Sequence, residues 1–203
     1  MLGMNGSRIK DLEKFWTVDN LKKIMNQSFI DKTSIFQTRP KYSNEGKKEI
    51  LHNFFENKKI GQSLKPVVVT AYDLEARKPI LLSSYGDPEV TAVQAANASS
   101  AAPIYFPTAS MEDGRWLIDG GIATNNPSLL GYIEAKKIFS TNSIKVLGIG
   151  AGLNKRKISG KNSRNWGALG WLRHDILGIM LESSLQNEIL KDLIGDNLSL
   201  IHI

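Results

Sequence analysis

Apolar and polar positions follow two different periods along the chain, and together they predict a mixed α/β fold. Residues 8–28 and 44–57 carry apolar side chains at helical spacing, so we expect an amphipathic helix in each range. Residues 67–71 form a continuous apolar, β-branched run, which predicts a strand covered on both faces. Residues 78–84 predict a second strand, paired with the first through a turn. In the helix at 44–57, the expected inward positions are Ile50, Leu51, Phe54 and Phe55, and the expected outward ones are Lys47, Lys48 and Glu49.

The second half of the chain alternates helices and strands. Residues 88–102 predict a helix with Asp87 as its N-cap and Pro88 in its first turn. A strand ending near residue 118, an amphipathic helix at 127–139 and a strand at 143–150 are typical of a βαβ unit and a parallel sheet. The remaining predicted elements are a long helix at 166–194, which contains three glycines that could bend it, and a final strand from residue 197.

Asp119 stands at the centre of the stretch 98–128. It follows a β-favouring apolar run and precedes Gly120 and Gly121, which can turn the chain sharply. A helix is then predicted with Asn126 as N-cap and Pro127 in its first position. Such an Asp is either the acceptor of local backbone hydrogen bonds in a turn or a carboxylate at the carboxyl end of a strand, where open α/β sheets bind ligands.

Four short sequences in this region are ASSAAP (98–103), YFP (105–107), LIDGG (117–121) and NNP (125–127), and their combination resembles the patatin-like phospholipase family. The resemblance is strongest over residues 66–152. It implies an α/β fold with a three-layer, patatin-like sheet flanked by helices. It also implies that Asp119 is the proton acceptor of a Ser-Asp dyad, and that Gly120 and Gly121 complete the motif and keep the backbone clear of serine and substrate.

The same resemblance implies a lipid ester substrate and no metal or organic cofactor. The helices predicted at 88–102 and 166–194 would line an acyl pocket, although the resemblance assigns no individual substrate-binding residue. Ser99 and Ser100 lack the Gly-x-Ser-x-Gly surroundings that expose a serine on a strand-to-helix elbow, so we do not propose either as the nucleophile.

Neither a Gly-x-Ser-x-Gly nor an Asp-Gly-Gly-Gly-x-Arg sequence occurs in the 203 residues. In the family both precede the Asp-Gly-Gly motif. We therefore expect residues 1–203 to be a single, N-terminally truncated patatin-like domain that lacks the first strands, the oxyanion loop and the nucleophile elbow. This predicts a phospholipase A-type lipid acyl hydrolase of which only the Asp half is present, and which is inactive alone. The alternative is a catalytically inactive relative that binds lipid or protein.

The net charge of +6 and the pI near 9.4 suit an anionic partner. Aromatic residues are not interleaved with the basic ones, so no nucleic-acid partner is predicted. Residues 153–165 form a basic loop that we interpret as solvated surface rather than a lipid-binding patch. Trp166 and Trp171 could meet a membrane interface, but an apolar stripe of this kind is more often core. Peripheral membrane contact and a cytoplasmic or membrane-peripheral location are therefore expectations, and oligomeric state is not predicted.

Three further features are given structural interpretations. His52 is expected to be a packed or half-exposed helix residue. Asp73 precedes the turn between the first two strands, and the family resemblance implies that its segment belongs to the structural scaffold. Gly148, Gly150 and Gly152 predict a turn at a strand end, because the spacing lacks the last glycine of a dinucleotide-binding loop. The chain contains no cysteine, and its three histidines lack metal-ligand spacing, so no metal site is predicted.

Overall fold

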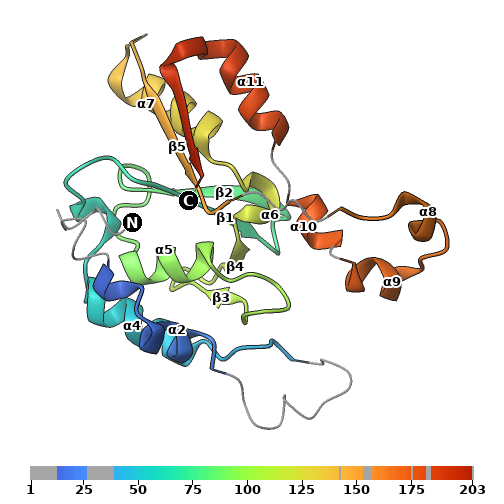
Figure 1. Ribbon diagram of the computed structural model, residues 1–203. Coiled ribbons are helices and arrows are strands. Elements are labelled where there is room, and N and C mark those ends of the chain that lie inside the picture. Colours follow the sequence, from blue (N-terminus) through green and yellow to red (C-terminus); the bar gives the residue numbers. More distant parts are fainter. Residues whose placement is uncertain are drawn as a thin grey trace. The chain divides into compact units, whose positions relative to one another are not determined.

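A computed structural model describes residues 13–26, 39–141, 143–152, 157–174, 176–181 and 184–202. The chain divides into two compact units, Met1–Ala123 and Thr124–Ile203 (Figure 1). Each unit has its own sheet with helices beside it. The mixed α/β architecture with sheets flanked by helices confirms the predicted fold class. Whether the chain is one incomplete domain, as the sequence predicts, stays a prediction.

The first unit is built around a four-stranded antiparallel sheet of order β2-β1-β4-β3. Its elements and α6, which follows them, are α2 (Val18–Ile24), α4 (Glu45–Phe55), η2 (Ile60–Gln62), β1 (Val68–Asp73), β2 (Lys78–Ser83), α5 (Ala92–Ser99), β3 (Ala109–Ser110), β4 (Trp116–Asp119) and α6 (Gly121–Thr124).

The β1–β2 hairpin confirms the predicted pairing, with Asp73 opposite Lys78 at its turn. The Asp73 Oδ1 accepts hydrogen bonds from the amides of Glu75 (3.0 Å) and Ala76 (2.9 Å), so its predicted structural role is confirmed. Alternate residues of β1 are buried. The residues between them are partly exposed, so the prediction that the strand is covered on both faces holds fully for one face only.

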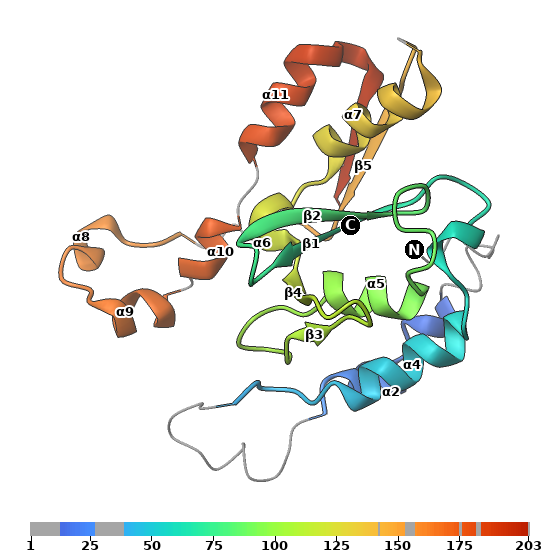
Figure 2. The same ribbon diagram turned by 180° about the vertical axis from the view of Figure 1, so that it is seen from behind.

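Helices stack on the covered face of this sheet in two layers. α5 packs against β1, β3 and β4, α4 packs against α5, and α2 packs against α4 (Figures 1 and 2). α4 lies within the predicted range 44–57, whereas α2 is shorter than predicted and has Thr17 as its N-cap. Residues 8–12 and 27–28 of that first prediction lie outside the described residues. The large side chains buried most completely in this unit are Phe55, Ile60, Leu82 and Leu117.

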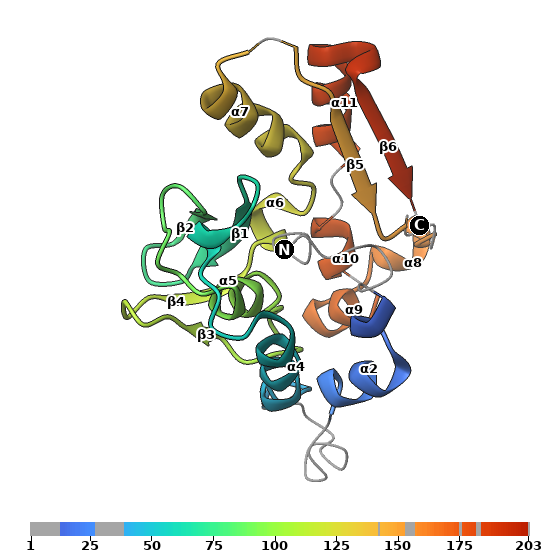
Figure 3. The same cartoon turned by 90° about the vertical axis from the view of Figure 1, so that its left-hand side faces the viewer.

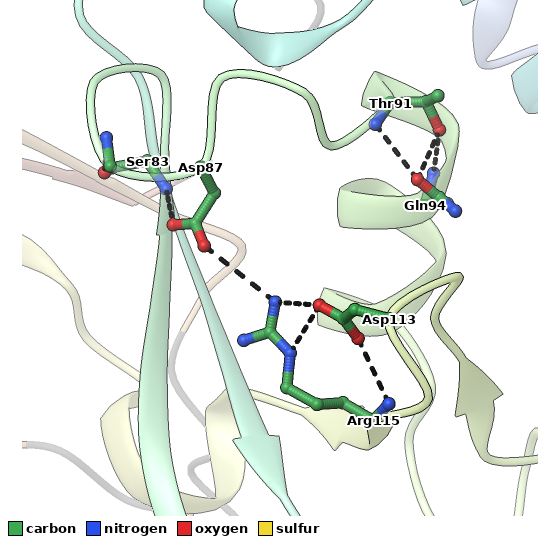
Figure 4. A network of polar contacts seen from close by, with 7 residues as sticks. Ser83, Asp87, Thr91, Gln94, Asp113 and Arg115 are labelled. Carbon is green, nitrogen blue, oxygen red and sulfur yellow. Dashed lines mark hydrogen bonds and ion pairs between the residues drawn. The ribbon is translucent and has the colours of Figure 1, made fainter.

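The start of α5 differs from the prediction, because the carboxylate of the expected cap, Asp87, bonds a nearby amide and a distant arginine instead. The Asp87 Oδ2 accepts from the Ser83 amide at 3.1 Å, and its Oδ1 lies 3.8 Å from the Arg115 guanidinium (Figure 4). The helix begins after Thr91 instead, where the Thr91 hydroxyl and the Gln94 side chain form a reciprocal capping box. The predicted start at Pro88 with Asp87 as N-cap is therefore wrong.

The second unit contains a two-stranded parallel sheet of β5 and β6, whose parallel direction is visible in Figure 3. α7 packs against β5 and α11, and α11 also packs against β6. The elements of the unit are α7 (Ser128–Phe139), β5 (Val146–Gly150), α8 (Gly160–Ser163), α9 (Ala168–Arg173), α10 (Ile176–Met180), α11 (Ser184–Ile194), η3 (Gly195–Asn197) and β6 (Leu198–His202).

Strand pairing corrects the predicted βαβ unit. β4 and β5 belong to different sheets, because β1 and β3 bond the two edges of β4 and leave no edge for β5. The parallel partner of β5 is β6, the predicted last strand. The strand end predicted at Gly148, Gly150 and Gly152 is confirmed only in part: Gly148 lies inside β5, the strand ends at Gly150, and Gly152 beyond it has a φ of 118°.

The helix predicted over 166–194 is three helices, α9, α10 and α11, over the described residues. α7 starts at Ser128, one residue later than predicted, and Pro127 is its N-cap residue. The Asn126 Oδ1 still accepts from the Ser128 amide at 3.0 Å. The apolar side chains of Ile133 and Phe139 are exposed, contrary to the expected amphipathic packing of this helix.

Candidate functional site

Asp119 is the last residue of β4, and it is held there by backbone bonds to elements on both sides. Across the sheet it is paired with Ala71 of β1. Its amide donates a 3.1 Å hydrogen bond to the carbonyl oxygen of Ala101, in the segment that follows α5. The predicted position of Asp119 at the carboxyl end of a buried strand is therefore correct, since Leu117 and Ile118 before it are buried.

The two glycines after Asp119 have different structural roles. A β-carbon on Gly120 would lie 2.3 Å from the carbonyl oxygen of Thr70, so only glycine lets the chain pass this close to β1. The Gly121 amide donates a 2.7 Å hydrogen bond to Asp119 Oδ1. This bond is the local turn contact that the sequence allowed for, and it leaves Oδ2 of the carboxyl group available for other chemistry.

A buried lysine lies near this carboxyl group. Lys47, on the first turn of α4, has a relative exposure of only 5%. Its Nζ donates a 3.1 Å hydrogen bond to the Ser100 carbonyl oxygen and lies 4.1 Å from the centre of the Phe106 ring. An ammonium this deeply buried is uncommon in proteins unless it is paired or hydrogen-bonded.

The environment shifts the protonation equilibria of both groups. Burial raises the pKa of Asp119, and the Gly121 amide and the positive charge of Lys47 oppose that rise. Burial lowers the pKa of Lys47 to about 8, against the opposing attraction of Asp119, and the neighbouring Lys48 charge lowers it further. A carboxyl group with a raised pKa is suited to take up and return a proton near neutral pH.

Lys47 is the residue that the sequence interpretation missed, because it was expected on the outward face of its helix. The signal was available in the spacing. Lys47 precedes Ile50 by three residues and Leu51 by four, so it lies on the same helix face as these two buried side chains. The hydrophobic pattern thus places a charged side chain in the core.

The other residues that the sequence singled out do not place their side chains at this site. The Ser100 hydroxyl donates 2.7 Å back to the Ala96 carbonyl of its own helix, which agrees with its exclusion as a nucleophile. His52 is an exposed residue of α4. α5 packs beside β4, whereas α9–α11 belong to the second unit, so the predicted acyl-pocket lining stays a prediction. No cluster of three or more metal-ligating side chains exists within the part of the chain that the structure describes.

The fold and site together define an α/β protein with a half-buried carboxyl group of raised pKa at the end of a strand. A family model described as patatin-like phospholipase matches residues 2–130. This is more than half of the 203 residues, and the chain belongs to the patatin-like phospholipase family. The match includes the strand β4, Asp119 and the two glycines that follow it.

Curated relatives extend the similarity to both units. Patatin-like protein 1 of Arabidopsis thaliana is 30% identical over 86% of this chain and 51% of its own length. Patatin-like protein 2 of the same plant is 32% identical over 68% of this chain and 41% of its own length. A cGAMP-activated phospholipase of Pseudomonas aeruginosa is 28% identical over 80% of this chain and 51% of its own length. The chain spans about half the length of the curated relatives it matches.

Among the residues that the structure describes, no helix is both long enough and apolar enough to cross a bilayer.

Proposed function

We propose that this chain is the acid–base part of a serine acyl hydrolase that cleaves lipid esters, with Asp119 as the proton acceptor. The observation that carries the proposal is the half-buried carboxyl group at the end of β4, because burial raises its pKa. This group lies inside the region that matches the patatin-like family. Relatives named phospholipases and patatin-like proteins support lipid esters as the substrate class.

In this proposal Asp119 acts twice. It first accepts the proton of a serine hydroxyl, whose oxygen forms an ester bond with the substrate acyl carbon while the alcohol product leaves with the proton from Asp119. It then accepts a proton from water, whose oxygen attacks the acyl-enzyme, and returns that proton to the serine as the fatty acid departs. Each step needs the carboxylate form at its start, because only that form accepts a proton.

The nucleophilic serine belongs, in the proposal, to sequence outside these 203 residues, since no Gly-x-Ser-x-Gly occurs within them. The first test is therefore to read the gene in frame upstream of the Met1 codon. A Gly-x-Ser-x-Gly and a glycine-rich oxyanion loop there support the proposal. A stop codon directly upstream contradicts it and favours the inactive, lipid- or protein-binding relative.

The second test is enzymatic and uses the protein with its upstream sequence. Asp119→Asn is expected to lower the rate of hydrolysis of a phospholipid or a p-nitrophenyl ester by about 10²–10⁴, the usual contribution of a general base. Asp192→Asn, at an exposed position of α11, is the matched control and should leave the rate unchanged. Unchanged hydrolysis by a folded Asp119→Asn variant would exclude the dyad.

We further propose peripheral contact with anionic lipid through residues 157–174, which replaces the interpretation of the basic loop as solvated surface alone. This segment contains no acidic residue, and its basic side chains flank Leu169 and Leu172 of α9, which are 80% and 55% exposed. The exposed basic residues are Lys157, Lys161, Arg164 and Arg173. Apolar side chains surrounded by cations favour a negatively charged lipid surface.

Vesicle sedimentation tests this contact. The wild-type chain is expected to sediment with vesicles containing phosphatidylserine and to remain in solution with pure phosphatidylcholine. Leu169→Ser with Leu172→Ser should weaken sedimentation, whereas Ile133→Ser, at an exposed position of α7, should not. Equal sedimentation by all three proteins would exclude residues 157–174 as the contact.

A further inference from the structure

Lys47 and Asp119 hold the carbonyl groups of two consecutive residues. The Lys47 ammonium donates to the Ser100 carbonyl oxygen at 3.1 Å, and the Asp119 amide donates to the Ala101 carbonyl oxygen at 3.1 Å. The segment between α5 and β3 is thereby fixed from α4 on one side and from β4 on the other. Ala101 itself is fully buried.

We propose that Lys47 is the positioning residue of the Asp119 site: its buried ammonium fixes the Ser100–Ala101 segment beside β4 and favours the ionised form of the Asp119 carboxyl group. The inference rests on the proposed function of Asp119, and it adds to the motif a residue 72 positions earlier in the chain. Lys47 does not contact substrate in this proposal; it acts through Asp119 and the segment that Asp119 bonds.

Burial of Lys47 has a free-energy penalty that simple packing does not require. An apolar side chain of similar length would fill the same space between α4, the Ser100 carbonyl and the Phe106 ring without desolvating a charge. One carbonyl oxygen and one aromatic face compensate the ammonium in part. The opposite charge that acts on it is that of Asp119. A buried cation beside a buried carboxylate is the arrangement in which each charge stabilises the other.

The surrounding elements leave Lys47 as the cation that acts on Asp119. α5 and β3 carry no ionisable side chain, and those of β1 are Tyr72 and Asp73. Asp73 is bonded to the amides of its own turn. On α4, Lys48 is exposed, and Glu49 forms an ion pair with Lys23 at the helix surface. Lys47 is also the charged group that contributes to the pKa of Asp119.

This arrangement serves a base that must be charged before it can act. Burial by itself would keep the Asp119 carboxyl group protonated to higher pH and reduce the fraction that can accept the serine proton. The Lys47 charge opposes this effect, and it thereby increases the fraction of Asp119 in the carboxylate form that a general base requires.

The test is an NMR titration of the Asp119 carboxyl carbon in the 203-residue chain, which needs no catalytic activity. In Lys47→Met the pKa of Asp119 is expected to rise, because burial then acts without the opposing cation. Lys47→Arg keeps the charge and is expected to return the pKa toward the wild-type value. Lys58→Met, which removes an exposed lysine just beyond α4, is the matched control and should leave it unchanged. An Asp119 titration that is the same in folded Lys47→Met and wild type would overturn the proposal.

A reciprocal experiment covers the case in which Lys47→Met does not fold. Coupling between two titrating groups acts equally on both, so Asp119→Asn must lower the pKa of Lys47 below its wild-type value of about 8. The Lys47 ε-carbon resonance reports this shift. An unchanged Lys47 titration overturns the proposal. Because neither experiment measures hydrolysis, the coupling can be confirmed even if the enzymatic test of Asp119 fails, and the reverse also holds.

Discussion

The carbonyl oxygen of Thr70 occupies the space that a side chain at position 120 would need. A β-carbon there would lie 2.3 Å from that oxygen and 2.4 Å from the Thr70 carbonyl carbon. Both are backbone atoms of β1, which is bonded on both edges and cannot move aside. The glycine that follows Asp119 is therefore required by the packing of β4 against β1, whatever its role toward a substrate.

Gly120→Ala is expected to lower the free energy of unfolding by about 1–3 kcal/mol, the usual range for overpacking. Gly131→Ala is the control, since a β-carbon on this exposed residue of α7 meets no atom within 4 Å. It should raise the free energy of unfolding by about 0.5–1 kcal/mol through helix propensity. Urea denaturation measures both, and a stability unchanged by Gly120→Ala would contradict the close approach.

The lowered pKa of Lys47 should make the free energy of unfolding depend on pH in the alkaline range. Its pKa is lowered from 10.5 to about 8 by folding, so between these values the unfolded chain binds the additional proton. The unfolding free energy must therefore rise with pH across this window, reach its full value above 10.5, and be lost as the pH falls through 8. From pH 8 to 10.5, the free energy of unfolding of the wild type should therefore rise by about 3 kcal/mol relative to that of Lys47→Met.

Denaturant titrations at several alkaline pH values measure this difference. Lys58→Met, at an exposed position, should parallel the wild type throughout. A difference between wild type and Lys47→Met that is constant over the window would show that Lys47 is not desolvated in the folded state.

The raised pKa of Asp119 should make the free energy of unfolding depend on pH in the acidic range. Burial raises its pKa above 3.8, so the folded chain holds the proton to higher pH than the unfolded chain. The stability that this group contributes is complete below 3.8 and is lost as the pH rises through the folded-state pKa. Asp119→Asn cannot titrate and keeps an acceptor for the Gly121 amide. Its unfolding free energy should exceed that of wild type at neutral pH, and the excess should disappear below 3.8.

Thermal unfolding at pH 3.5, 5 and 7 measures how much more stable Asp119→Asn is than the wild type. Asp192→Asn on the surface of α11 is the matched control and should show no comparable gain. An Asp119→Asn variant less stable than wild type at pH 7 would mean that the charged carboxylate is a net stabilising group.

The hydrogen bonds that Asp73 accepts are expected to stabilise the β1–β2 hairpin. Asp73→Ala removes the acceptor of the Glu75 and Ala76 amides and is expected to lower the free energy of unfolding by about 1–2 kcal/mol. Asp73→Asn retains an oxygen at the same position and should retain most of the stability. Urea denaturation distinguishes the two, and equal losses in both variants would show that the carboxylate charge, rather than its hydrogen bonds, stabilises the turn.

Local patterns determined much of the first unit. The β-branched run before Asp73 became β1, and the apolar spacing of residues 44–57 became α4. The position of Asp119 at the end of a strand also follows from its neighbours, since an apolar run followed by two glycines is typical of a strand that ends in a turn. These features depend on residues that are close in sequence, and short-range propensity is sufficient to define them.

Tertiary structure decided where long-range partners compete with local preference. Asp87 is of a residue type that favours an N-cap, but its carboxylate faces the guanidinium of Arg115, 28 residues later in the chain, and α5 begins after Thr91. β4 lies between two antiparallel neighbours rather than beside β5, because β1 and β3 occupy both of its edges. Helical spacing places Lys47 on the buried face of α4, but its interaction with Asp119 needs α4, β4 and the Ser100 carbonyl to meet in space. Pairing, capping and charge compensation across such separations depend on which surfaces the fold brings together, and one chain's local pattern does not contain that information.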